Sequence, residues 1–175
     1  DIEYGKVGER KLLLNLYSPE KLETPKPGLI FIHGGGWTSG DRNDYKYYTV
    51  RFAKRGYVVA TIGYRFEGFP ACVEDAKCAV RWMRANAAEL NVDPDKIAVI
   101  GGSAGGYLSM MVGYTSDKPE LEGQGGWPGV SSKVAAVVDL YGPVDLTVPY
   151  ARHHPTITNF IKRSYEDAPE LYAQA

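Results

Sequence analysis

The residues best suited to chemistry stand in the middle of the chain, where positions 101–105 read Gly-Gly-Ser-Ala-Gly. This is the pattern G-x-S-x-G, in which a serine is held on a sharp turn between a strand and a helix. The apolar run Ile97 to Ile100 precedes the motif, and a segment rich in Ala, Leu and Met, from Ala104 to Tyr114, follows it. This order predicts a turn that lifts the Ser103 hydroxyl above the carboxyl edge of a sheet, beside the positive end of a helix.

Ser103 is therefore the candidate nucleophile for acyl transfer. The glycines two residues to either side, Gly101 and Gly105, let neighbouring backbone approach without side-chain clashes. The alternative is a purely structural turn whose serine caps the following helix. A second glycine motif favours the catalytic interpretation.

That second motif, His33-Gly34-Gly35-Gly36-Trp37, directly follows the apolar run Leu29 to Ile32. Three glycines at the end of a strand leave backbone N–H groups unshielded. Acyl transfer needs such donors, because negative charge develops on the former carbonyl oxygen in the tetrahedral intermediate. A phosphate-binding loop is the alternative, but no Lys-Ser or Lys-Thr follows and the G-x-G-x-x-G spacing is not completed. The motif therefore predicts an oxyanion hole.

Four short apolar runs predict strands that are buried on both faces, at residues 29–32, 57–62, 97–100 and 134–138. Helical patterns separate them at 45–55, at 71–90 and at 104–114. Residues 91–95 are rich in turn formers and should end the long helix. This alternation predicts an α/β fold with a doubly wound, mostly parallel sheet, to which residues 3–7 and 11–17 add an antiparallel hairpin. Prolines 149, 155 and 169 break up the tail, and residues 1–175 are taken as one domain.

The composition excludes several classes of function. A net charge of −1 does not favour nucleic acid or an anionic membrane as partner. No apolar run approaches the ~20 residues that cross a bilayer, and the first residues do not form a signal peptide. We therefore expect a soluble protein, cytoplasmic or secreted. No Cys/His group has the spacing of metal ligands, and Cys72 and Cys78 lie too far apart along a predicted helix for a disulfide, which predicts free thiols.

Together the two motifs resemble those of the hormone-sensitive-lipase-like esterases and the bacterial carbohydrate (acetyl or feruloyl) esterases of the α/β-hydrolase superfamily. Other stretches are similar to the same family, so that the resemblance covers residues 2–145: Gly63-Tyr64-Arg65, Asp75 with Arg81-Trp82, and Asp93-Pro94. The resemblance implies hydrolysis of carboxylic esters through an acyl-enzyme on Ser103. It implies no metal and no organic cofactor.

The resemblance also assigns roles within the two motifs. Backbone N–H groups of Gly35, Gly36 and Ala104 would form the oxyanion hole, with Gly34 as a further candidate. His33 would shape the loop through hydrogen bonds and would not act as the catalytic base. Trp37 and Trp127 are candidates for lining a pocket near the serine.

The chain departs from this family after Ser103. The family carries its catalytic acid and histidine on two later strands, whereas only His153 and His154 follow the serine here, in a stretch with no strand before it. The later carboxylates do not stand where the family's acid is expected: Asp139, Asp145 and Asp167. We therefore expect a domain that lacks its C-terminal strand–helix units.

Three alternatives to an ordinary esterase stay open. In the first, the chain is an impaired or inactive hydrolase, which keeps the pocket but lacks the triad Asp and His that activate the serine. In the second, His153 or His154 substitutes for the base. In the third, the same scaffold serves an amidase or peptidase. The substrate is expected to be a small-molecule ester, of the short-chain or carbohydrate-linked kind that the resemblance implies.

The missing units bear on partners as well. The strand around residues 134–140 would be left with an open edge, which is a template for pairing with another chain. We expect self-association, pairing with a complementary C-terminal segment, or a tail, residues 143–175, folded back over the edge.

Overall fold

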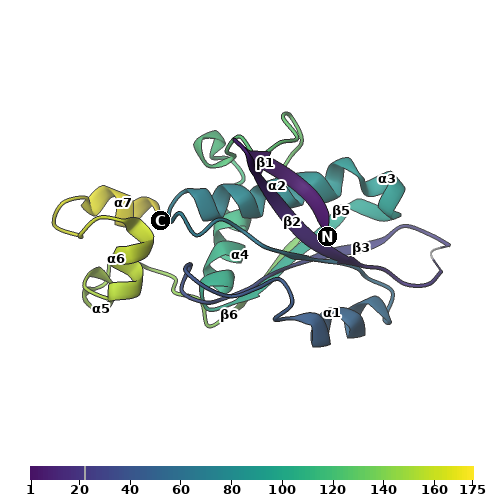
Figure 1. Cartoon of the computed structure of the whole chain (residues 1–175), viewed down its shortest axis with the longest axis horizontal. Helices are drawn as coiled ribbons and strands as arrows, with labels where there is room; N and C mark the ends of the chain where they lie inside the picture. The colour runs from purple at the N-terminus through teal and green to yellow at the C-terminus, as the bar shows by residue number, and fades with distance from the viewer. Residues whose placement is uncertain (22) are drawn as a thin grey trace.

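A six-stranded sheet forms the centre of the molecule (Figure 1), in a computed structural model that describes residues 1–21 and 23–175. The strand order is β1-β2-β4-β3-β5-β6. β1 and β2 form an antiparallel hairpin, β2 pairs antiparallel with β4, and the remaining pairs are parallel. The strands are β1 Ile2–Val7, β2 Arg10–Tyr17, β3 Lys26–Ile32, β4 Val58–Ile62, β5 Val92–Gly102 and β6 Ala136–Leu140.

Helices cover both faces of this sheet, as the alternation of patterns predicts. α1 packs on β4 and β2 from one face, while α2, α3 and α4 lie on the other (Figure 1). Successive side chains of β3 point to opposite faces of the sheet. Ile30 and Ile32 pack in the larger core, and Phe31 packs with Ala53 of α1 on the other face. The helices are α1 Lys46–Ala53, α2 Ala71–Ala85, α3 Ala87–Leu90, α4 Ala104–Tyr114, a 3₁₀ turn Pro119–Leu121, α5 Pro149–Arg152, α6 Pro155–Ile161 and α7 Pro169–Gln174.

Two predicted boundaries are corrected by the structure. The long helix predicted at 71–90 is divided at Asn86 into α2 and α3. The turn predicted at 91–95 is confined to Asn91, whose φ of +52° ends α3 in the left-handed conformation. β5 begins directly afterwards, at Val92, which pairs with Lys26 across an irregularity in the β3 ladder.

The two cysteines are free and buried on α2, as predicted. The Cys72 thiol contacts the carbonyl oxygen of Arg65 at 3.0 Å, and Cys78 lies 3.7 Å from the carbonyl oxygen of Tyr4. Burial raises the pKa of Cys72 to about 12 and that of Cys78 to about 11. Both thiols therefore stay protonated and act as packing groups.

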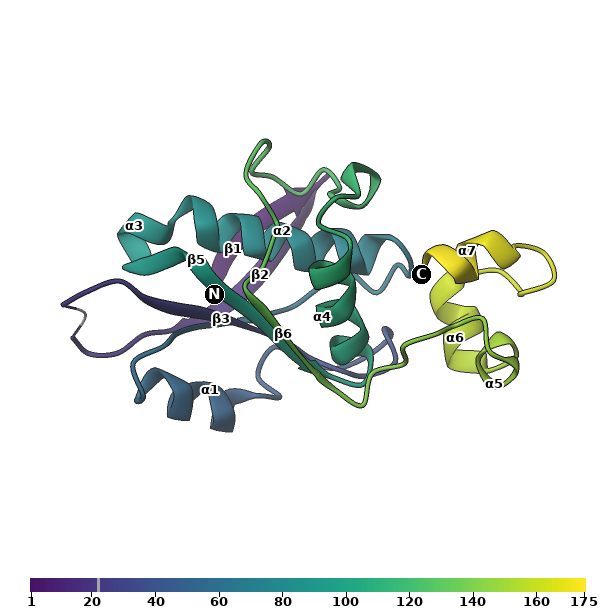
Figure 2. The ribbon, with the colours of Figure 1, turned by 180° about the vertical axis from the view of Figure 1, so that it is seen from behind.

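The tail forms three short helices, each of which begins at one of the prolines. Proline suits the first helical position, because its missing N–H would have no partner there in any case. α5 to α7 lie together beyond the carboxyl end of the parallel strands (Figure 2). They do not fold back along β6, so the expectation that the tail covers the sheet edge is wrong.

β6 is the edge strand that the sequence predicts, since β5 is its only partner strand in the described part of the chain. Large apolar side chains stay exposed along it and in the segment that follows, among them Val138 at 42%, Leu140 at 40% and Val144 at 79%. An unpaired edge beside apolar surface is the arrangement that pairs with other chains.

We expect this chain to self-associate through β6, or to bind a complementary C-terminal segment there. Sedimentation velocity over a range of protein concentrations should show dimers or larger species. Val138→Lys places a charge on the exposed edge and should return the protein to a monomer. A wild-type protein that stays monomeric at high concentration would contradict self-association and leave only the binding of a complementary segment.

Candidate active site

The G-x-S-x-G motif forms the turn from β5 into α4. Ser103 has φ +55° and ψ −122°, a backbone conformation that is strained for any residue with a side chain. Its N–H donates to the carbonyl oxygen of Leu140 at 2.9 Å, and its own carbonyl accepts from the N–H of Tyr107 at 3.0 Å to begin the helix. This is the sharp strand-to-helix turn that the motif predicts, with the serine exposed.

The glycines of this turn are required by close backbone packing. A Cβ atom on Gly105 would lie 2.0 Å from the carbonyl oxygen of Ile32, and one on Gly101 would lie 2.3 Å from the carbonyl oxygen of Gly105. α4 therefore begins pressed against the end of β3, which carries the other motif. Gly101 and Gly105 thus support the turn by leaving room for backbone that lies too close for any side chain.

The second motif leaves β3 at the same edge of the sheet. β3 and β5 are parallel neighbours, with Ile32 paired to Gly101, so both loops emerge side by side. A Cβ atom on Gly34 would lie 2.8 Å from the carbonyl oxygen of Gly102 and 3.4 Å from the Cβ of Ser103. The two motifs therefore touch through Gly34.

The loop is folded by positive φ angles at three successive residues, +104° at Gly35, +59° at Gly36 and +59° at Trp37. The carbonyl of Gly35 turns inward and accepts from the N–H groups of Thr38 and Ser39, each at 3.1 Å. In the part of the chain that the structure describes, the N–H groups of Gly35, Gly36 and Ala104 donate to no protein acceptor. Ala104 stands in the first turn of α4, where N–H groups have no intrahelical partner.

His33 lies behind this loop. Its side chain is buried, its ring stacks on Tyr64 at 4.4 Å, and Nδ1 lies 2.8 Å from the carbonyl oxygen of Gly34. Burial lowers the pKa of His33, so the ring is neutral, and a neutral ring that donates from Nδ1 holds the Gly34 carbonyl. Tyr64 in turn donates its hydroxyl to the His33 carbonyl at 3.0 Å. These contacts fit a residue that shapes the loop.

Ser103 opens into a pocket of about 330 Å³. Trp37 lines it, as predicted, but Trp127 does not: its indole N–H donates to the carbonyl of Tyr4 at 2.7 Å, beside β1. Sequence reasoning missed most of the wall, which comes from residues after β6 and from the tail. The lining residues are Gly36, Trp37, Ser103, Ala104, Tyr141, Gly142, Pro143, Tyr150, His154, Thr156 and Ile157.

The two late histidines are placed differently. His154 lines the pocket and precedes α6, where its Nδ1 accepts from the N–H of Thr156 at 3.3 Å. This contact engages the Nδ1 of His154 with the backbone at the start of α6. His153 is exposed, with Nδ1 3.7 Å from a carboxylate oxygen of Glu166. Within the described residues neither ring is hydrogen-bonded to Ser103.

The later carboxylates hold backbone or hydroxyl groups. Asp139 accepts from the N–H of Gly142 at 2.9 Å. Asp145 accepts from the N–H of Thr147 at 2.8 Å, and Asp167 from the hydroxyl of Ser164 at 2.8 Å. The described residues contain no cluster of three His, Cys, Asp or Glu side chains that would hold a metal ion, and no helix among them has the length and apolar character of a membrane span.

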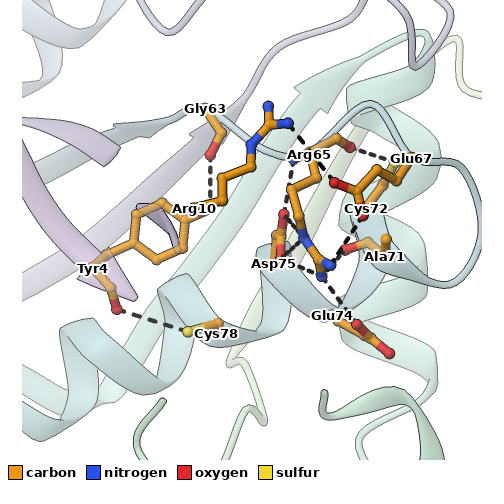
Figure 3. A network of polar contacts seen from close by, with 10 residues as sticks. All are labelled: Tyr4, Arg10, Gly63, Arg65, Glu67, Ala71, Cys72, Glu74, Asp75 and Cys78. Atoms are coloured by element: carbon orange, nitrogen blue, oxygen red, sulfur yellow. Dashed lines mark hydrogen bonds and ion pairs between the residues drawn. The ribbon is translucent and has the colours of Figure 1, made fainter. Parts of the chain in front are cut away.

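A buried ion-pair network supports the loop after β4 (Figure 3). The Arg65 guanidinium donates to Asp75 at 2.8 and 3.0 Å, and the Arg65 backbone N–H also donates to Asp75 at 2.8 Å. Burial alone would lower the pKa of Arg65, but the hydrogen bonds and charge of Asp75 outweigh it and raise that pKa. The network fastens α2 to the segment that carries Tyr64, and hence to the back of the loop 33–37.

Comparison with known proteins finds that the chain is similar to esterases. The sequence profile of the family described as BD-FAE matches residues 14–175. Esterase LipQ of Mycobacterium tuberculosis is 33% identical over an alignment that covers 100% of this chain and 43% of LipQ. The probable carboxylic ester hydrolase LipM of the same organism is 32% identical, over 97% of this chain and 40% of LipM. This chain thus spans about two fifths of the length of these relatives.

Solved structures agree with this assignment. Thermogutta terrifontis esterase 2, phosphonylated by sarin, superposes with a TM-score of 0.81 at 32% identity, covering 93% of this chain and 62% of that one. A bifunctional GH43-CE protein of Bacteroides eggerthii has a TM-score of 0.87 at 27% identity, covering 99% of this chain and 27% of that one. The mostly parallel sheet, its helical layers and the profile match agree, and the chain belongs to the BD-FAE family of α/β-hydrolases.

Proposed function

We propose that this chain supplies the nucleophile and the oxyanion hole of a carboxylic ester hydrolase that works through an acyl-enzyme on Ser103. The observation that carries the proposal is the meeting of two loops at one sheet edge: a strained, exposed serine beside the N–H groups of Gly35, Gly36 and Ala104, which have no protein acceptor in the described residues. Since the chain spans about two fifths of its curated relatives, the activity of a complete enzyme is part of this proposal.

The chemistry follows from these groups. Ser103 Oγ bonds to the ester carbonyl carbon while its proton passes to a base, and the carbonyl electron pair moves onto oxygen. The N–H groups of Gly35, Gly36 and Ala104 donate to that oxyanion, at the end of α4 that favours negative charge. The tetrahedral intermediate then expels the alcohol, which takes up the proton. Water repeats the sequence on the acyl-enzyme and releases the acid.

The substrate proposed for this pocket is a short-chain or carbohydrate-linked ester. A volume of about 330 Å³ is at the small end for ligand sites, which suits a short acyl group. Tyr141 and Tyr150 line the mouth with mostly exposed rings. Flat aromatic faces of this kind suit an alcohol portion that carries a ring.

An impaired hydrolase is the second candidate function, and a specific observation favours it. No described histidine is hydrogen-bonded to Ser103, and the Nδ1 of the nearby His154 is engaged by the backbone N–H of Thr156. A serine without a base is a poor nucleophile, and an oxyanion hole alone supplies only about 10³–10⁴-fold acceleration over water. The 175-residue chain is therefore expected to turn over esters slowly.

Hydrolysis of 4-nitrophenyl acetate tests both candidates, with added imidazole as an external base. We expect a slow rate that rises with imidazole concentration and falls to the level of imidazole alone in Ser103→Ala. If wild type and Ser103→Ala give the same rates with and without imidazole, the proposed function is wrong. Fast turnover without imidazole would contradict the impaired alternative, and His153→Ala and His154→Ala would then locate the base.

A further inference from the structure

Trp37 adopts a conformation that needs support from its surroundings. It has φ +59°, and it follows two glycines with positive φ in the oxyanion loop. A residue with a side chain persists in this region only when neighbouring groups hold it there. The indole is almost fully buried, yet its Nε1 has no hydrogen-bond acceptor among the described residues. Ring packing must therefore fix the side chain.

Phe160 provides that packing. Its ring stacks on Trp37 with centroids 4.1 Å apart and planes at 20°. Tyr107 meets both rings edge-on, at 5.3 Å in each case. We name these three residues the aromatic clamp. Its members come from the oxyanion loop, from the first turns of α4 after Ser103, and from α6 of the tail. Three segments far apart in sequence are thereby joined at the active site.

α6 is itself anchored to the body of the protein. The Phe160 carbonyl accepts from the N–H of Phe69 at 3.0 Å, and the Phe69 ring lies 6.2 Å from that of Phe160. At the other end of the helix, the methyl group of Thr156 is so close to Gly36 that a Cβ there would lie 2.9 Å from it. The tail helix therefore presses on the oxyanion loop at two adjacent residues, Gly36 and Trp37.

We infer that Phe160 is a positioning residue for the oxyanion hole: it holds Trp37 in its strained conformation and so keeps the N–H groups of Gly35 and Gly36 in place. The inference rests on the proposed function for the role of those N–H groups. The geometric part, that Phe160 orders the loop, stands independently of catalysis. Phe160 is not one of the described residues that line the pocket, whereas Trp37 is, so Phe160 acts through Trp37.

The test compares Phe160→Leu with Tyr172→Leu. Both residues are aromatic and about 1% exposed, and both lie on tail helices. Among the described ring pairs, Tyr172 packs against Tyr165 and against no ring of the clamp. The readout is the backbone order parameter from ¹⁵N relaxation. Labelling glycine with both ¹⁵N and carbonyl ¹³C selects the glycines that follow another glycine, namely Gly35, Gly36, Gly102, Gly106 and Gly126.

We expect order parameters of about 0.85 for Gly35 and Gly36 in wild type and in Tyr172→Leu, falling below about 0.6 in Phe160→Leu. Gly126, in a distant loop, should not change. Imidazole-assisted hydrolysis dependent on Ser103 should fall about tenfold in Phe160→Leu with KM unchanged, since losing one oxyanion donor outright costs about 10²–10³-fold.

The outcomes separate the two proposals. Rigid Gly35 and Gly36 in Phe160→Leu overturn the inference, and so does an equal loss of order in Tyr172→Leu, which would mean that any damage to the tail has this effect. If wild type shows no hydrolysis dependent on Ser103, the proposed function fails while the order parameters still decide the positioning role. Should Phe160→Leu not fold, Phe160→Met, which retains apolar volume without a ring, is subject to the same expectations.

Discussion

Gly105→Ala should abolish the folded protein, or lower its free energy of unfolding by more than about 4 kcal/mol. The added Cβ would lie 2.0 Å from the Ile32 carbonyl oxygen and 2.7 Å from that of His33. Both atoms are backbone at the end of a central strand, so neither can rotate away as a side chain would. Alanine favours a helix over glycine by about 1 kcal/mol, and this overlap exceeds that gain several-fold.

Gly63→Ala is the matched control. A Cβ there would have the Leu13 carbonyl oxygen as its nearest neighbour, at 3.6 Å, which is ordinary van der Waals contact. The φ of Gly63 lies outside the left-handed region, so we expect Gly63→Ala to change the free energy of unfolding by no more than about 1 kcal/mol. Urea denaturation followed by circular dichroism measures both variants. A Gly105→Ala protein that unfolds at the wild-type urea concentration would show that α4 does not press on β3 as described.

Asp75→Ala should lower the free energy of unfolding by about 3–5 kcal/mol, because it leaves the buried Arg65 without its main partner. Asp75 is 1% exposed and accepts from the guanidinium and from the backbone N–H of Arg65. Glu74 stays within 3.0 Å of the guanidinium, but it cannot replace the backbone contact. The loop that bears Tyr64 should loosen as well, since Arg65 is the next residue along the chain.

Glu67→Gln is the control for this network. Its carboxylate lies 3.4 Å from Arg65 but is 53% exposed, and exposed ion pairs contribute only about 0–1 kcal/mol. The double variant Arg65→Met with Asp75→Leu removes both charges and should be more stable than Asp75→Ala alone. Thermal unfolding of wild type and of these three variants measures the differences in stability. If Asp75→Ala and Glu67→Gln lose equal stability, the buried ion pair contributes no more than the exposed one.

Much of the fold could be predicted because its signals are local. The β4 run, 58–62, is buried along its whole length, and a run of β-branched and small apolar residues indicates that environment without reference to the rest of the chain. The turn at Ser103 was predictable for a similar reason, since strand, glycine motif and helix are contiguous. Loops that follow neighbouring parallel strands meet at the same edge of a sheet, so the two motifs could be expected side by side, while the close approach of Gly34 to Ser103 is known only from the structure.

The tail was not predictable in this way. Phe160 stacks on Trp37 across most of the chain, and neither residue belongs to a periodic pattern that would indicate the other. The pocket wall formed by Tyr150, His154 and Ile157 depends on that docking. Trp127 was misplaced for the same reason, because its hydrogen bond to Tyr4 reflects how a long loop crosses β1. Tertiary contacts of single residues leave no trace in local composition.

The placement of β3 beside β5 has a consequence for how the protein folds. Ile32 pairs with Gly101, so the ladder that joins the two motifs closes a loop of about seventy residues. Closing so long a loop loses chain entropy before the native contacts can stabilise it, and pairings of this kind therefore form slowly. Each motif can adopt its local turn early, on either side of the unclosed loop. The two loops come together only when that distant pairing forms, so the pocket at Ser103 should appear together with the slowest folding phase rather than with the first helices.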